Sequence, residues 1–125
     1  MDIQKFTIPN RLACYGELVA TCANNSEDLR HREAYNIKLV RWAIGKTNLD
    51  PVRRNCTVHI HWVEPSARRR HAHVAAGAIF IEQALLDAGI ISDPIQIECI
   101  YSTFAVNADN PRVEVSIEGA RKWQA

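Results

Sequence analysis

The sequence lacks several features that would assign it to a specialised class of protein. Its 125 residues hold no run near the ~18 apolar residues of a membrane span, and the first five residues carry no apolar signal-peptide core. The four cysteines form no C-x-x-C pair, and the formal net charge is only +1. These absences predict a cytoplasmic protein, and they argue against a globally basic nucleic-acid-binding chain, so any charged surface must be local.

What is present is typical of one globular domain. Hydrophobic residues make up 47% of the chain and charged residues 23%, which is enough apolar material for an ordinary core. A chain of this length buries roughly two-thirds of its unfolded surface, so it needs neither a disulfide nor a metal to fold. We therefore expect a single domain over residues 1–125, with reduced, buried thiols at Cys14, Cys22, Cys56 and Cys99.

Hydrophobic periodicity predicts an α+β fold. Apolar residues alternate over 3–8, 56–63, 95–101 and 113–118, which indicates strands. Spacings of three and four indicate helices over 26–44 and 74–88, each followed by a glycine, Gly45 or Gly89. Residues 10–25 predict a loop with short helical turns. The simplest assembly is one mixed sheet of about four strands with two main helices on it.

Two groups of polar residues have both a structural and a functional interpretation. His59 and His61 share one face of a strand and could ligate a metal, but no third ligand is evident, so we expect ordinary polar-face residues. The outer face of the first predicted helix is basic, which indicates either a solvated face or a phosphate contact; its members are Arg30, Arg32, Lys38 and Arg41.

The densest positive charge lies between the second predicted strand and the second helix. Residues 67–73 read ARRRHAH, and we call them the basic segment. The segment holds three arginines and two histidines and no carboxylate. It is either a solvated loop or a surface on which the arginines bind phosphate directly.

Four stretches of the chain resemble the RusA family of Holliday-junction resolvases, in particular its phage-borne branch. They are FTIPNRL at 6–12, VHIHWVEP at 58–65, ALLDAG at 84–89 and NPRVEV at 110–115. Together they span nearly the whole chain in the expected order. The resemblance implies a RusA-like domain over residues 1–125 and a small dimeric endonuclease that cuts branched DNA with Mg²⁺ held by aspartates.

The aspartates that the resemblance implies are missing here. The family motif runs roughly Arg-Arg-Asp-x-Asp-Asn, followed by a helical lysine and an Asp-Asp pair. An ungapped alignment over 62–89 places Arg70 and Ala72 at the paired aspartates and His73 at the asparagine, and only Asp93 survives of the later pair. A shift by one or two residues places His71 and His73 at the paired positions and still supplies no carboxylate.

This substitution removes the chemistry that holds Mg²⁺. Magnesium requires hard oxygen ligands, whereas an arginine at a ligand position repels a divalent cation by several kcal/mol at ~4 Å. Imidazoles favour Zn²⁺, Ni²⁺ or Cu²⁺ instead. We therefore predict no catalytic residue, no metal and no cofactor.

Three functions remain open. The first is an inactive RusA-like protein that binds branched or duplex DNA through Arg68, Arg69, Arg70, His71 and His73. The second is an active endonuclease with a transition metal on His71, His73 and Asp93, helped by Glu64 or Glu98. The third is a phage-encoded protein-interaction module or inhibitor that binds a host protein. The resemblance implies a homodimer in each case.

Overall fold

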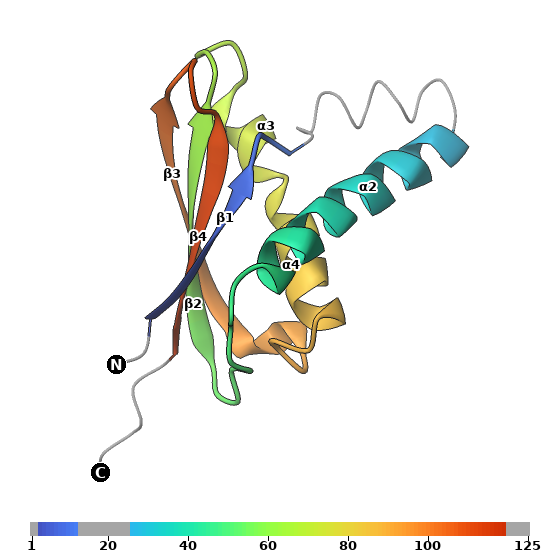
Figure 1. Cartoon of the computed structure of the whole chain (residues 1–125), viewed down its shortest axis with the longest axis vertical. Coiled ribbons are helices and arrows are strands. Elements are labelled where there is room, and N and C mark those ends of the chain that lie inside the picture. The colour runs from blue at the N-terminus through green and yellow to red at the C-terminus, as the bar shows by residue number, and fades with distance from the viewer. Residues whose placement is uncertain (1–2, 13–25, 120–125) are drawn as a thin grey trace.

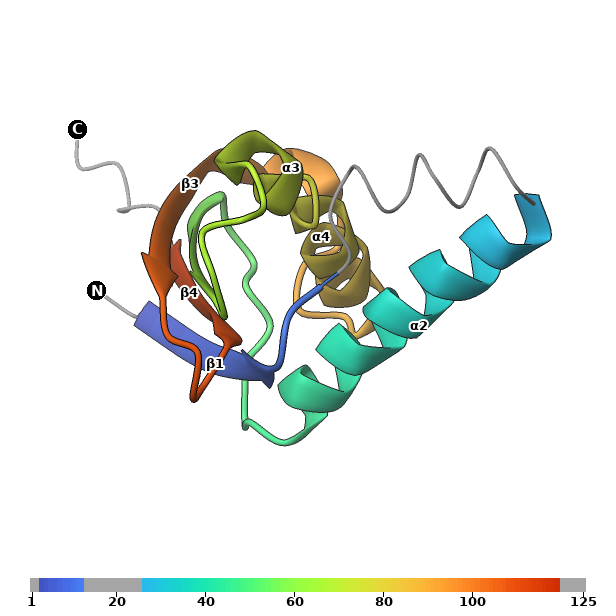
Figure 2. The same ribbon diagram turned by 90° about the horizontal axis from the view of Figure 1, so that it is seen from above.

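A four-stranded mixed sheet carries the described helices on one of its faces (Figures 1 and 2). In the computed structural model, which describes residues 3–12 and 26–119, the strand order is β1-β4-β2-β3. The strands are β1 (Ile3–Pro9), β2 (Cys56–Glu64), β3 (Ile97–Val106) and β4 (Arg112–Gly119). The helices are α2 (Ser26–Gly45), α3 (His71–Ala75), α4 (Ala78–Asp87) and the short 3₁₀ turn η1 (Pro94–Gln96). The predicted α+β domain, with a mixed sheet of four strands and two main helices, is confirmed.

Because of the strand directions, three connections lie at one end of the sheet: the segment after β1, the segment after β2 and the turn between β3 and β4. β4 is antiparallel to both β1 and β2, while β2 and β3 are parallel and are joined by a crossover through α3 and α4. Pro9 and Val63 both pair with Arg112, so β1 and β2 finish at the same end of the sheet on either side of β4. The segment after β1 and the basic segment after β2 therefore start at the same place.

The second strand divides its side chains between the core and the open face as its alternation predicts. Its core-facing residues, Cys56, Val58, Ile60 and Trp62, are all buried. His59 on the opposite face is exposed and His61 is partly exposed, because no helix among the described residues covers that face (Figure 2). Burial raises the pKa of the Cys56 thiol, and the negative charge of Glu98 raises it further, so this cysteine is protonated at neutral pH. Cys14 and Cys22 lie outside the described residues.

The prediction for the third strand is wrong at both ends and in the facing of its residues. Residues 94–96 form η1, and the strand runs from Ile97 to Val106 rather than from 95 to 101. The register shifts between Cys56 and Thr57, which pair with Ile97 and Cys99. The extra residue reverses the alternation, since a slip of one position moves every later side chain to the other face. Cys99 and Tyr101 therefore stand on the open face beside Thr57 and His59.

The second predicted helix is divided in two. α3 ends at Ala75 and α4 begins at Ala78, with Gly77 between them. A Cβ atom on Gly77 would lie 3.2 Å from the Trp62 ring, so this glycine lets the chain approach the sheet closely at the break. Val74, Ile81 and Leu85 are buried as predicted, whereas Ala88 is exposed beyond the end of α4. Gly89 ends the helix at φ +74°, a conformation that favours glycine.

The first helix covers the predicted range 26–44 and also includes Gly45, one residue past the predicted end. α2 packs against α4 and β1, its residues Val40 and Ile44 are buried in the core, and its basic residues are exposed. No helix within the described ranges is long and apolar enough to cross a membrane. The loop predicted over 10–25 is described only as far as residue 12, and the rest of it lies outside the described residues.

We expect Ile81→Asp to destabilise the fold by about 3–5 kcal/mol, because it buries a charge in the core between α4 and the sheet. Ile79→Asp on the same helix is the matched control, since Ile79 is 62% exposed and its replacement costs about 0.5 kcal/mol or less. Urea unfolding of both variants tests the assignment of the helical face, and equal losses of stability would contradict it.

Candidate nucleic-acid interface

The chain turns sharply after β1 and crosses the end of the sheet. Asn10 has φ 71°, a left-handed conformation that asparagine tolerates better than most residues. Its backbone N–H donates to the Pro111 carbonyl at 3.1 Å, and its side-chain oxygen accepts from the Arg11 N–H at 2.9 Å. The turn brings Leu12 into the core, where it is 4% exposed. Arg11 is thereby held beside the end of β2.

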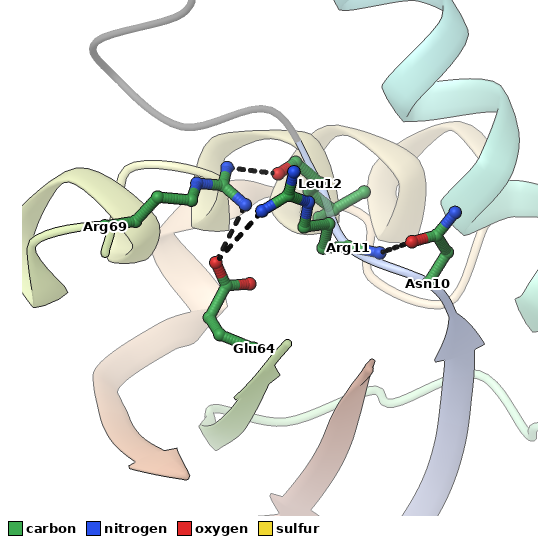
Figure 3. A network of polar contacts seen from close by, with 5 residues as sticks. All are labelled: Asn10, Arg11, Leu12, Glu64 and Arg69. Carbon is green, nitrogen blue, oxygen red and sulfur yellow. Dashed lines mark hydrogen bonds and ion pairs between the residues drawn. The ribbon is translucent and has the colours of Figure 1, made fainter. Parts of the chain in front are cut away.

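The middle arginine of the basic segment points into the protein (Figure 3). Arg69 donates from Nη1 to Glu64 Oε1 at 2.9 Å and from Nη2 to the Leu12 carbonyl at 2.7 Å. The side chains of Arg69 and Glu64 are only 12% and 8% exposed. A buried carboxylate is costly unless it is paired and hydrogen-bonded, so Glu64 and Arg69 need each other. The pair fixes the basic segment to both β2 and the segment that follows β1.

Anchoring Arg69 leaves its two neighbours in solvent. Arg68 and Arg70 are exposed on either side of it, and Arg70 is the N-cap residue of α3. The chain carries no carboxylate between Glu64 and Glu82, so neither arginine has an acidic residue nearby in sequence. Two exposed guanidinium groups at this end of the sheet form a cationic surface, which suits phosphate oxygens.

The two histidines of the basic segment lie on α3 with different environments. His71 is exposed, and its ring stacks flat on Phe104 of β3, with centroids 4.0 Å apart and an interplanar angle of 2°. His73 is partly exposed two residues further on. The stacking fixes α3 above the end of β3, so His71 lies at the same end of the sheet as Arg68 and Arg70.

Asp93 lies at the opposite end of the sheet. It is the N-cap of η1, where its side chain accepts from the Ile95 N–H at 2.9 Å. The buried Gln96 fixes this turn by donating to the carbonyls of Val52 and Arg54, just before β2. β3 begins here and reaches Phe104 seven residues later, a separation of about 23 Å at the usual strand rise.

The structure therefore does not bring His71, His73 and Asp93 together. Glu64 is paired with Arg69, and Glu98 accepts from Asn55 at 2.7 Å, so neither stands beside the two histidines as a free ligand. Over residues 3–12 and 26–119, no three His, Cys, Asp or Glu side chains are arranged to hold a metal ion. The donors of the basic segment are guanidinium and imidazole groups, and this set does not fit Mg²⁺.

His59 and His61 meet a residue that the sequence analysis missed. His59 Nε2 lies 2.8 Å from the Thr103 hydroxyl oxygen, and His61 Nδ1 lies 2.7 Å from the same atom. Thr103 occupies the point at which the two imidazoles converge. Only the parallel pairing of β2 with β3 brings these residues together, and the sequence carried no signal for that register.

No protein-family model matches the chain, and no curated protein matches it.

Replacing one member of the Glu64–Arg69 pair should destabilise the protein more than replacing both. Arg69→Met leaves a buried carboxylate without its main partner, and we expect a loss of about 3–5 kcal/mol in the free energy of unfolding. Glu64→Leu should cost a similar amount, while the double variant Glu64→Leu/Arg69→Met should recover much of the loss. Urea unfolding of the four proteins completes the cycle, and additive losses would show that the pair is not coupled.

Proposed function

We propose that the protein is a RusA-like DNA-binding protein that does not cleave DNA. The basic segment binds the phosphate backbone of branched or duplex DNA through Arg68, Arg70, His71 and His73. Arg69 acts by positioning the other two arginines. The observation that carries the proposal is the exposure of Arg68 and Arg70 on a segment that the Glu64–Arg69 pair holds in place.

The resemblance supports DNA as the partner, and the charge of the segment suits it. Guanidinium groups bind phosphate oxygens without a bridging metal, and a few such contacts give a modest affinity that falls as salt rises. The donor set at this end of the sheet favours phosphate binding over Mg²⁺-assisted hydrolysis. Branched DNA is the expected preference because the resemblance is to junction resolvases.

We expect the protein to bind a labelled four-way junction and linear duplex without cutting either in Mg²⁺, Mn²⁺ or Zn²⁺. Binding should weaken with salt, and Arg68→Gln/Arg70→Gln should flatten the plot of log affinity against log salt by about 1 to 2. The measurement is fluorescence anisotropy over a salt series, with a denaturing gel for cleavage. Cutting that Asp93→Ala abolishes would replace this proposal with an active, metal-dependent endonuclease.

The matched control is Arg30→Gln/Arg41→Gln on the exposed face of α2, which removes the same charge. If both double variants reduce the salt dependence of binding equally, the basic segment has no special role. If only the α2 variant reduces the salt dependence of binding, the interface lies on α2. No binding at all would favour the protein-interaction module, tested by capture of a host protein.

We further propose that the protein is a homodimer that pairs through β3. Within the described residues β3 has only β2 as a neighbour, and its ten residues include one charge, Glu98, and no lysine or proline. Ile100 and Tyr101 are 41% and 58% exposed along it. The other edge, β1, is shorter and carries Lys5 and Pro9, which discourage pairing. An antiparallel pair of β3 strands would join two sheets across a twofold axis.

Ile100→Lys should convert the dimer into a monomer, because a lysine on the pairing edge opposes strand addition. Ile3→Lys is the control, since Ile3 is 50% exposed on the other edge strand. Sedimentation equilibrium of the wild type and both variants distinguishes dimer from monomer. A monomeric wild type, or a dimer unaffected by Ile100→Lys, would remove β3 as the interface.

A further inference from the structure

We infer that Arg11 is a further phosphate-binding residue, so that the anion site is built from two separate segments of the chain. This inference rests on the proposed function and extends it. The sequence analysis assigned no role to Arg11, which lies more than fifty residues before the basic segment. The structure places it beside the same carboxylate that anchors Arg69.

Glu64 faces two guanidinium groups with one negative charge. Its Oε1 atom lies 2.9 Å from Arg69 Nη1 and 3.9 Å from Arg11 Nη1 (Figure 3). The shorter contact is a hydrogen bond, and the longer one is beyond hydrogen-bonding distance. The three side chains together carry one excess positive charge, and that charge lies on the more loosely held arginine.

Arg11 is also the more accessible of the two. Its side chain is 43% exposed, against 12% for Arg69. Arg69 has its Nη1 and Nη2 atoms committed to Glu64 and Leu12, whereas Arg11 can turn a guanidinium edge to solvent. Attraction to Glu64 at 3.9 Å limits where Arg11 can go and so lowers the entropic cost of ordering it on an anion.

The backbone holds Arg11 and the basic segment in a fixed relation. The positive φ of Asn10 and its hydrogen bond to Pro111 fix the start of the turn, and the buried Leu12 fixes its end. The Leu12 carbonyl is in turn bound by Arg69, which stands between Arg68 and Arg70. A polyanion such as a nucleic-acid backbone can therefore contact both segments at once.

The test compares Arg11→Gln with Arg53→Gln in the full chain, with anisotropy on the labelled four-way junction and on duplex. Arg53 is exposed just before β2, at the opposite end of the sheet, so its replacement removes the same charge far from the site. We expect Arg11→Gln to weaken binding about tenfold, as the loss of a hydrogen bond to a charged group predicts, and to lower the salt slope by about 0.9. Arg53→Gln should change binding less than twofold. Arg11→Lys should keep the salt slope while recovering only part of the affinity, since lysine retains the charge but cannot donate the two parallel hydrogen bonds of a guanidinium group.

Each outcome separates this inference from the function on which it rests. Equal affinities for Arg11→Gln and Arg53→Gln, with binding still weakened by Arg68→Gln/Arg70→Gln, would overturn the role of Arg11 alone. A wild-type protein that binds neither DNA would overturn both proposals. A fall in melting temperature for Arg11→Gln that accounts for the lost binding would assign Arg11 to structure, so thermal unfolding is measured on the same samples.

Discussion

The arrangement at the end of the sheet depends on one buried ion pair. Glu64 closes β2 in a position that water barely reaches, and Arg69 satisfies it while also binding the Leu12 carbonyl. Without that pair, nothing would distinguish the middle arginine of the basic segment from its neighbours. With it, one arginine is largely buried while its two neighbours remain exposed at the surface. A single carboxylate thus determines how many of the three arginines are free to meet a ligand.

The sequence predicted the fold correctly where the spacing of its apolar residues matches the positions that are buried in the structure. Alternation over β2 placed Val58 and Ile60 in the core and His59 on the open face, and the structure has them there. It failed at β3, because the register shift after Cys56 reverses the alternation and no local signal marks such a shift. It also missed the break at Gly77, where close approach to Trp62 outweighs a helical pattern that continues through the break.

The candidate site was predictable only in part for a related reason. Charge density and the missing carboxylates drew attention to residues 67–73, and Arg68 and Arg70 are exposed there. The inward turn of Arg69 depends on a partner five residues earlier and on a carbonyl 57 residues away. The first of these could have been found, since a carboxylate at the end of a buried strand requires a cation. The second depends on β1 and β2 reaching the same end of the sheet on either side of β4, which is a property of the whole sheet.

That non-local assembly has a kinetic consequence. The Leu12–Arg69 bond closes a loop of 57 residues and forms only when β1 has joined β4 at the sheet edge, and contacts of such long range are slow to form. β1 has a single neighbouring strand, so its separation from the sheet would break no pairing among β2, β3 and β4, while exposing the buried Phe6 and Ile8. In that opened state Arg69 loses its carbonyl partner while keeping Glu64. The shape of the cationic surface is thus controlled by the edge strand most distant from β3, and fraying at one side of the sheet is transmitted to the basic segment.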